Sequence, residues 1–174
     1  DGGRSWQVDS SQEDVIYTNI QFVNENVAYV AGEFGTVLRS DDGGGSWEPL
    51  PVIPDDFYPQ YMYFRDADTG WLAGLGGSIL HTTDGGRTWA RQPSRTSAPI
   101  YGLTEVGGDM YAVGGEGALL RLVEGTWKRV RHGKPIRLFL RATEPVGDNR
   151  LLIGGREGVL HILPVGDLPL GATS

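Results

Sequence analysis

The stretch "HTTDGGRTW", residues 81–89, places an acid, two glycines, three threonines and a tryptophan within one short turn. A similar stretch, "RSDDGGGSW", occupies residues 39–47, and "DGGRSW" at residues 1–6 matches the end of the same pattern. The tryptophans that close these turns, with one more along the chain, are spaced by 41, 42 and 38 residues: Trp6, Trp47, Trp89 and Trp127. A spacing of about forty residues indicates an internal repeat and not a single reactive loop.

The sequence before each turn repeats as well. The corresponding stretches are "VAGEFGTVLRSDDGGGSW" (30–47), "LAGLGGSILHTTDGGRTW" (72–89), "AVGGEGALLRLVEGTW" (112–127) and "LIGGREGVLHIL" (152–163). Apolar neighbours such as Val30 with Ala31, and Val37 with Leu38, point to opposite faces because alternate residues of a strand face opposite ways. This pattern predicts sheets that are covered on both faces by other sheets.

Each unit divides into four short strands, A to D, so the predicted fold class is all-β: a β-propeller of four-stranded antiparallel blades in one domain, residues 1–163. The expected blades span about 16–50, 58–92 and 99–130, with an isolated strand D at 5–8, strands A to C at 136–163 and a C-terminal tail at 164–174. These are three complete blades plus a split fourth, because the first strand lacks A to C and the last unit lacks D.

Two arrangements fit this plan. The chain ends pair within one blade and close a ring of four blades, or the chain forms part of a larger ring of seven or eight blades. The start inside the first motif favours the larger ring. An open half-ring exposes apolar blade faces, so self-association is a further expectation.

Composition excludes several classes of function. The 174 residues contain no cysteine, and no apolar run approaches the roughly 20 residues that span a bilayer. The net charge is −7; residues 1–92 carry 5 basic and 14 acidic side chains, and residues 93–174 carry 10 and 8. This balance argues against nucleic-acid binding, whereas its asymmetry suits the orientation of a protein partner.

The acid–glycine turns have a structural and a metal-binding interpretation. The Asp can accept N–H bonds from its own turn, the glycines supply positive φ, and the Trp can pack between blades. Calcium takes six or more oxygen ligands, but each turn offers only one or two carboxylates. The histidines His81, His132 and His161 lack a zinc-binding spacing, and no P-loop is present. We therefore expect no metal and no cofactor.

The turns resemble Asp-boxes, also called BNR repeats. The resemblance implies that they are structural hairpins between strands C and D of a blade. The matching residues are Ser40, Asp42, Gly44, Trp47, Thr82, Asp84, Gly86 and Trp89, with Trp6 and Trp127 in partial copies.

A longer pattern, with Phe64-Arg65-Asp66 and Gly70-Trp71 ahead of Gly74, resembles the photosystem II stability/assembly-factor family. That family consists of seven-bladed BNR propellers that bind membrane-protein assembly intermediates. The resemblance implies a non-enzymatic scaffold that binds another protein, with a membrane-protein complex as the candidate partner, and it favours a periplasmic or other extracytoplasmic location.

Sialidases also carry Asp-boxes, so a sialidase-like or other glycan-binding or glycoside-hydrolase BNR domain is the alternative. Their chemistry needs an arginine cluster, a Tyr nucleophile with a Glu partner, and an acidic acid/base residue. No recognisable order of these groups occurs here, and we name no catalytic residue.

Loops between strands D and A, and between B and C, share one face of a propeller, opposite the Asp-boxes. Two D–A regions are rich in aromatic and basic residues, the types favoured in interface hot spots. The candidate protein-binding residues are Asp55, Asp56, Phe57, Tyr58, Tyr61, Arg129, Arg131, Lys134 and Arg137. A solvated run of charge is the alternative interpretation.

Strand C of every unit also carries a basic residue, and these are Arg39, His81, Arg121 and His161. Equivalent positions in a propeller form a ring. The ring either covers the tryptophans and meets Asp-box carboxylates, or faces a partner.

Overall fold

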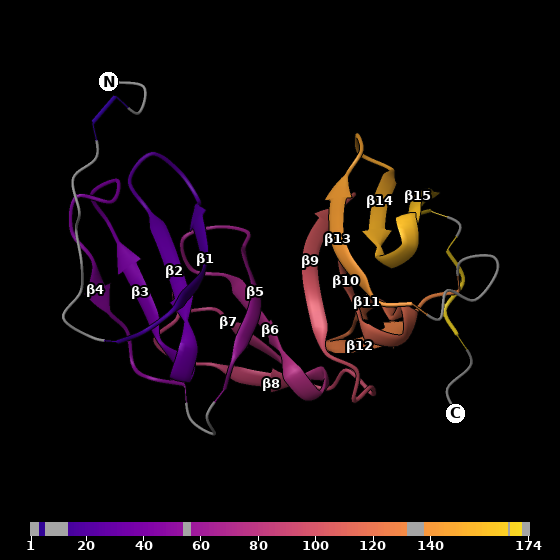
Figure 1. The fold of residues 1–174 in the computed structure, drawn as a ribbon, viewed down its shortest axis with the longest axis horizontal. Coiled ribbons are helices and arrows are strands. Elements are labelled where there is room, and N and C mark those ends of the chain that lie inside the picture. The colour runs from indigo at the N-terminus through magenta and orange to yellow at the C-terminus, as the bar shows by residue number, and fades with distance from the viewer. Residues whose placement is uncertain (1–3, 6–13, 54–56, 132–137, 167, 172–174) are drawn as a thin grey trace.

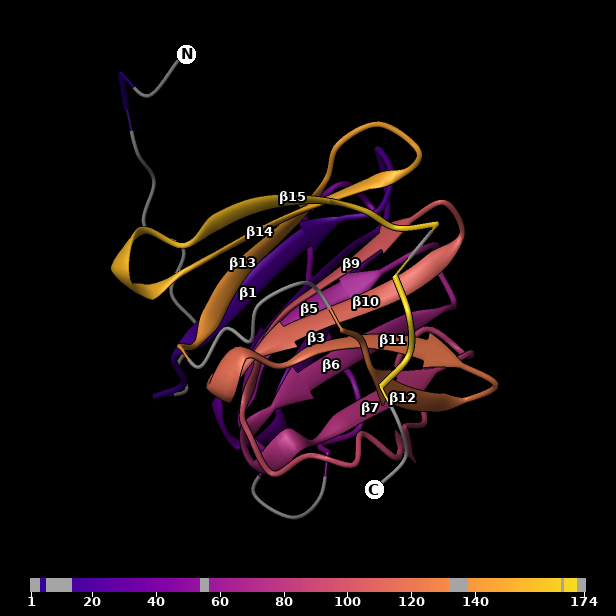
Figure 2. The same cartoon turned by 90° about the vertical axis from the view of Figure 1, so that its right-hand side faces the viewer.

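The computed structural model describes residues 4–5, 14–53, 57–131, 138–166 and 168–171. Four antiparallel sheets stand side by side in a row, each with its strands in chain order (Figures 1 and 2). Three sheets have four strands and the last has three. The predicted all-β propeller of four-stranded antiparallel blades is therefore confirmed, as a partial propeller. Of the isolated strand D expected at 5–8, only Ser5 belongs to the described residues.

Each sheet is one blade. Blade 1 contains β1 (Tyr17–Phe22), β2 (Ala28–Gly32), β3 (Val37–Ser40) and β4 (Glu48–Pro49). Blade 2 contains β5 (Pro59–Phe64), β6 (Gly70–Gly74), β7 (Ile79–Thr82) and β8 (Ala90–Gln92). Blade 3 contains β9 (Ile100–Val106), β10 (Asp109–Gly114), β11 (Leu119–Val123) and β12 (Thr126–Arg129), and blade 4 contains β13 (Leu140–Pro145), β14 (Arg150–Gly155) and β15 (Leu160–Pro164). Between the second and third strands lie the short 3₁₀ turns η1 (Glu33–Gly35), η2 (Leu75–Gly77), η3 (Gly115–Gly117) and η4 (Arg156–Gly158).

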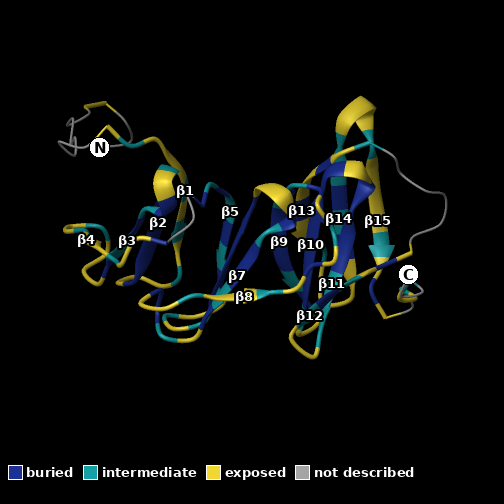
Figure 3. Cartoon of the chain, turned by 90° about the horizontal axis from the view of Figure 1, so that it is seen from below, coloured by how far each residue is buried: buried dark blue, intermediate teal, exposed yellow. Residues whose placement is uncertain are grey.

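Three apolar cores fill the spaces between successive blades, and each uses side chains from both neighbours. In the first, the Tyr29 ring of blade 1 stacks on Phe64 of blade 2, with 3.6 Å between ring centroids, and Trp89 meets Phe64 edge to face. Figure 3 shows that the buried residues concentrate in the strands, whereas the connecting turns are exposed. The row of blades follows from sheets that are apolar on both faces.

The first strands of successive blades, β1, β5, β9 and β13, also contact one another along the inner side of the row. Here Gln21 of β1 bonds to the backbone of blade 2. Its side-chain nitrogen donates to the carbonyl of Phe64 and its side-chain oxygen accepts the N–H of the same residue, both at 2.7 Å. The amide thus satisfies the open edge of β5 as a neighbouring strand would.

We expect Gln21→Ala to lower the free energy of unfolding by about 1–3 kcal/mol, because it leaves a partly buried N–H and a carbonyl without partners. The measurement is chemical denaturation followed by tryptophan fluorescence. The control is Asn19→Ala, since Asn19 lies on the same strand and face and its amide makes only an exposed bond to Thr18. An equal loss in both variants would contradict the role of Gln21.

The Asp-box of blade 2 is closed by its own polar groups. The Thr82 hydroxyl donates to Asp84 at 2.8 Å and accepts the N–H of Gly86 at 2.9 Å. Asp84 in turn accepts the hydroxyl of Thr88 at 2.6 Å and its N–H at 2.9 Å. Blade 1 repeats this network with Ser40, Asp42, Gly44 and Ser46 at the corresponding positions.

The glycines of these turns are required by the backbone. Gly43 and Gly85 have φ of 75° and 70°, and each donates its N–H to the neighbouring turn between strands A and B of its own blade, at Asn26 and Asp68. The Asp-box therefore fastens two turns at one end of the blade.

The tryptophans that close the Asp-boxes of blades 2 and 3 point toward the preceding blade. Trp127 is fully buried in the second core, and its indole N–H donates to Gln92 at 3.0 Å. The N–H of Trp71 reaches the same oxygen at 3.1 Å. The indole N–H of Trp89 is buried without a partner among the described residues.

Acid should weaken the fold through the Asp-boxes. Hydrogen bonds from Thr88 lower the pKa of Asp84 to about 2, and those from Ser46 lower that of Asp42 to about 2, against an ordinary value of 3.8. The unfolded chain then binds more protons, so this contribution to stability is complete above about pH 4 and is lost as the pH falls toward 2. We expect the double variant Asp42→Asn/Asp84→Asn to be less stable at neutral pH and to lose less stability between pH 4 and 2.

The measurement is the free energy of unfolding across this pH range. The exposed Asp148 in the A–B turn of blade 4 supplies the control variant Asp148→Asn, which should keep the dependence of the unchanged protein. A double variant with the full dependence on pH would contradict the assignment.

Candidate functional site

Every 3₁₀ turn lies beside the chain that leads into its own blade or out of it. Ile53 donates its N–H to Gly35 of η1, the Ser94 hydroxyl donates to Gly77 of η2, and Arg156 of η4 donates to Phe139. We call this end of the blades, with η1–η4 and the connections between blades, the turn face. It lies opposite the end that carries the Asp-boxes.

Exposed apolar residues occur in the turns and connections at the turn face of blades 1 and 2. We call this set the turn-face patch, and it consists of Ile16, Tyr17, Phe34, Val52 and Leu75. Phe34 is 62% exposed and Val52 is 69% exposed. Scattered exposed apolar residues are ordinary in proteins, but several within neighbouring turns mark an interaction surface.

Glu33 holds three segments of this surface together. Its carboxylate accepts the N–H of Ile16 at 3.3 Å and the hydroxyl of Tyr58 at 3.2 Å, while its own N–H donates to the carbonyl of Ile16 at 3.0 Å. Burial, with the neighbouring Glu33 carboxylate, raises the pKa of the Tyr58 hydroxyl, so it stays protonated and can donate. Ile16 and Tyr58 are thereby fixed around η1.

Phe34 occupies a strained position in η1. Its φ is 57°, in the left-handed region that a bulky side chain disfavours. The corresponding residues of the other turns are Gly76, Glu116 and Glu157, with φ of 60°, 55° and 58°. A side chain placed at Gly76 would meet nothing within 4 Å, so packing does not demand one there. Blade 1 instead holds an aromatic ring toward solvent at a cost in backbone strain.

The aromatic residues predicted to bind a protein differ in how far they are buried. Phe57 is only 7% exposed and belongs to the first core, so its ring is not part of the surface. This corrects its prediction as a protein-binding residue, and the physical reason is that the ring fills the space under Gly74. Tyr61 is half-buried on β5 against the second core, and Tyr58 reaches the turn face. Asp55 and Asp56 lie outside the described residues.

Among the predicted basic residues, Arg129 and Arg131 are exposed. Arg129 reaches the turn face, with its guanidinium 3.5 Å from the carbonyl oxygen of Glu116 in η3. The backbone N–H of Arg131 donates to Pro169. Lys134 and Arg137 lie outside the described residues.

Three of the four residues of the predicted basic ring occupy equivalent positions. Arg39 pairs across the sheet with Tyr29, His81 with Trp71 and Arg121 with Tyr111. The prediction is wrong for His161, which pairs with Ile153. The residue of blade 4 at the position of Arg39, His81 and Arg121 is Ile162, which pairs with Leu152. Since neighbouring residues of a strand point to opposite faces, this shift of one residue turns His161 away from the others. The four residues therefore do not form one ring.

The three equivalent residues pack on aromatic rings of strand B or make ion pairs. His81 stacks on Trp71 with 4.7 Å between ring centroids, and burial lowers its pKa, with Arg65 adding to the effect. Arg121 forms an ion pair with Asp109 at 2.6 Å. These contacts fit the structural interpretation of the basic positions better than a surface that faces a partner.

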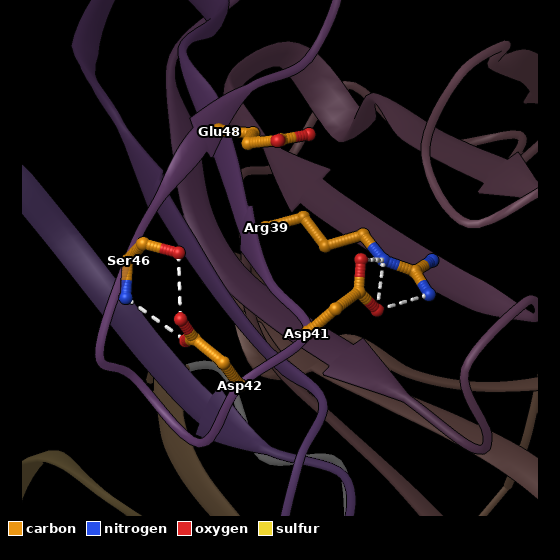
Figure 4. Close-up of a pocket in the computed structure, with 5 residues that line it drawn as sticks. All are labelled: Arg39, Asp41, Asp42, Ser46 and Glu48. Atoms are coloured by element: carbon orange, nitrogen blue, oxygen red, sulfur yellow. Dashed lines mark hydrogen bonds and ion pairs between the residues drawn. The ribbon is translucent and has the colours of Figure 1, made fainter.

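Arg39 also borders a small pocket, lined by Arg39, Asp41, Asp42, Ser46 and Glu48 (Figure 4). Its guanidinium donates to the Asp41 carboxylate through Nε and Nη2. It also donates to the Tyr29 hydroxyl at 2.7 Å and to the carbonyl of Ala67 in blade 2 at 3.0 Å. The carboxylate of Asp42 is engaged by Ser46. Apart from Glu48, the polar side chains of this pocket thus bind in pairs, Arg39 with Asp41 and Asp42 with Ser46, and an external ligand would have to displace these bonds.

Within the part of the chain that the structure describes, no group of three or more His, Cys, Asp or Glu residues could hold a metal ion. The same residues include no helix long and apolar enough to cross a membrane.

Sequence reasoning missed most of the turn-face patch. It selected loops rich in charge and aromatics, whereas Ile16, Phe34, Val52 and Leu75 are isolated apolar residues in short turns. A signal was present in the aligned turns, because Phe34 stands where the other repeats carry Gly or Glu.

Known proteins resemble this chain in both sequence and fold. Residues 2–101 match a family described as Photosynthesis system II assembly factor YCF48. A solved structure of YCF48 bound to D1 peptide has a TM-score of 0.67 at 22% identity, covering 93% of this chain and 56% of that chain. YCF48 from Cyanidioschyzon merolae gives a TM-score of 0.64 at 18% identity, covering 98% and 62%. No curated protein matches.

The computationally designed Ika4 protein has a TM-score of 0.69 at 15% identity, covering 92% of this chain and 96% of that chain. These likenesses to solved structures show the fold, and the chain spans only about three fifths of the YCF48 chains that it matches. The sequence match covers more than half of this chain and includes the first Asp-boxes. The chain therefore belongs to the photosynthesis system II assembly factor YCF48 family.

Proposed function

We propose that this chain is a non-enzymatic propeller scaffold that binds another polypeptide through its turn face and acts as an assembly or stability factor for a membrane-protein complex. The observation that carries the proposal is the turn-face patch around Phe34, a ring held in solvent by a strained backbone. Strain that packing does not require is often retained for binding.

The chemistry of the patch suits a polypeptide ligand. Aromatic and aliphatic side chains at the centre of an interface supply most of the binding free energy, and polar groups surround them. Here the polar groups are the Glu33 carboxylate and the Tyr58 hydroxyl, which already fix the backbone beneath Phe34. Little further ordering is then needed on binding.

Family membership supports the same function. One solved YCF48 is bound to D1 peptide, so a related propeller takes a polypeptide ligand. The exposed Arg129 and Arg131 would attract an acidic segment of such a ligand and speed its association.

Replacing Phe34 by glycine should separate stability from binding. Because glycine adopts positive φ without strain, we expect Phe34→Gly to stabilise the chain by about 1 kcal/mol. The same change should weaken binding at least tenfold, since it removes the aromatic anchor. The measurements are chemical denaturation and the fluorescence anisotropy of a labelled D1 peptide of the kind that YCF48 binds.

The matched control is Glu116→Gly, which relieves the same backbone strain in η3 without removing an apolar side chain. It should raise stability and leave affinity unchanged. Equal affinity of Phe34→Gly and the unchanged protein would contradict the role of the turn-face patch. Absence of D1 peptide binding by the unchanged protein would contradict the assembly-factor assignment.

The basic residues are tested by Arg129→Glu/Arg131→Glu. We expect the double variant to slow association with the peptide and to reduce the dependence of the rate on salt, because exposed charges act mainly on association. Arg150→Glu, an exposed residue of β14, is the control. An unchanged association rate in the double variant would remove these arginines from the binding surface.

The glycan-directed alternative is tested directly. A fluorogenic sialoside incubated with the protein should release no fluorophore above the buffer rate. Release that depends on protein concentration would overturn the non-enzymatic proposal.

A further inference from the structure

A histidine lies at the interface between blades 2 and 3. His81 of β7 stacks on Trp71 of β6, with 4.7 Å between ring centroids. Trp71 is only 2% exposed and belongs to the second core, which both blades share. Arg65 lies against the same indole, with its guanidinium carbon 5.1 Å from the ring centroid. A buried aromatic ring thus contacts one permanent cation and one group that becomes a cation in acid.

The neighbours of His81 also hold blade 2 to blade 3. Arg65 donates to the carboxylate of Glu105 on β9 at 2.7 Å. The indole N–H of Trp127 in blade 3 donates to Gln92 of blade 2 at 3.0 Å, and the N–H of Trp71 donates to the same oxygen. A change in the position of Arg65 or Trp71 therefore acts directly on the contact between the two blades.

Blades 1 and 3 carry an arginine at the position of His81. The guanidinium of Arg39 in blade 1 donates to the carbonyl of Ala67 in the next blade at 3.0 Å. Arg121 of blade 3 forms an ion pair with Asp109. The side chain of His81, in contrast, makes no hydrogen bond or ion pair with the described residues. The cations of blades 1 and 3 thus have oxygen partners that a protonated His81 lacks.

A shorter turn explains this difference. The carbonyl that Arg39 reaches belongs to residues 65–69, which connect β5 to β6. In blade 3 the connection from β9 to β10 contains only Gly107 and Gly108. This turn therefore has no residue equivalent to Ala67, and it has no side chain that could accept a proton from His81.

Within blade 2, the only charged group that acts on His81 is a cation. Strand β6 has no ionisable residue, and Ala90 is the partner of His81 on β8. Arg91, the next residue of β8, points to the other face of the sheet. The carboxylate of Asp84 is occupied by its own turn. Arg65 of β5 remains, and its charge opposes protonation of His81.

Blade 3 does not offset this charge at His81. On the face toward blade 2, its strands carry Glu105 on β9 and Arg129 on β12. The carboxylate of Glu105 is already bonded to Arg65, and it lies 3.4 Å from the hydroxyl of Tyr63. Arg129 lies at the turn face, beside Glu116. A proton on His81 would therefore add a second positive charge without a carboxylate to pair with it.

The direction of the pH dependence follows from these contacts. Burial, with the neighbouring Arg65 guanidinium, lowers the pKa of His81 from its ordinary value of 6.5. The unfolded or opened chain then binds a proton more readily than the closed interface does. The stabilisation from neutral His81 is therefore complete above about pH 6.5, and it is lost as the pH falls through the lower pKa of the folded state.

We propose that the interface between blades 2 and 3 is a pH-sensitive switch, in which protonation of His81 places a second cation against Trp71 beside Arg65 and loosens the contact. The interface between blades 1 and 2 keeps its strength in this pH range, because Arg39 is charged throughout. Loosening changes the spacing between parts of the turn face, since Leu75 belongs to blade 2 and Arg129 to blade 3.

The test is hydrogen exchange of the Trp127 indole N–H, measured by NMR and divided by the intrinsic rate at each pH. From about pH 7.5 to about pH 5, we expect its protection to fall at least about threefold. The internal control is the backbone N–H of Phe64, which bonds to Gln21 across blades 1 and 2 and should keep its protection. The Asp-box carboxylates stay ionised in this range, so they do not contribute.

Two variants isolate the histidine. His81→Phe keeps a ring on Trp71, and His81→Gln keeps a polar side chain, but neither can be protonated, so each should remove the pH dependence at Trp127. The matched control is His161→Gln, since His161 is an exposed histidine of β15, and it should keep the dependence. Circular dichroism would verify that the variants fold.

Three results would overturn the proposal. They are constant protection of Trp127 in the unchanged protein, an equal loss of protection at Phe64, and a pH dependence that survives in a folded His81 variant. None of these outcomes depends on peptide binding at Phe34.

Discussion

A sheet with apolar side chains on both faces is stable only between two other sheets, and this constraint governs the whole chain. The contact of Tyr29 with Phe64 and Trp89 shows how it is met, since the rings of one blade fill the face of the next. Polar groups complete the contact, as Gln21 bonds to the edge of β5 and Arg39 reaches the carbonyl of Ala67. Each blade therefore supplies one side of the apolar core that it shares with its neighbour.

The Asp-box serves this arrangement locally. Its carboxylate is occupied by hydroxyl and N–H groups of its own turn, which leaves it little capacity for an external ligand and lowers its pKa. Its glycines link two turns of the same blade, and its tryptophan points toward the preceding blade. The Asp-box is rich in polar atoms, but these atoms hold two turns of the same blade together. A binding function is therefore expected at the other end of the strands.

At that end the repeats differ in the way that a binding surface requires. The 3₁₀ turns share one backbone conformation, which sets the positions of their middle residues, and only the side chains vary among Phe34, Gly76, Glu116 and Glu157. Because the turn backbone repeats and only the side chain at its middle residue varies, one blade can present an aromatic side chain for binding without a change in fold.

The sequence by itself determined the blade plan, because a forty-residue repeat, turn glycines and strands that are apolar on both faces together are typical of a propeller. It also indicated the family and the structural nature of the Asp-box. Only the tertiary structure decided which side chains are available. Phe57 proved to be buried and His161 lay one residue out of register, since a strand reverses its faces with every residue. Phe34 became a candidate only when its positive φ and its exposure were known, because both depend on how η1 meets residues distant in sequence.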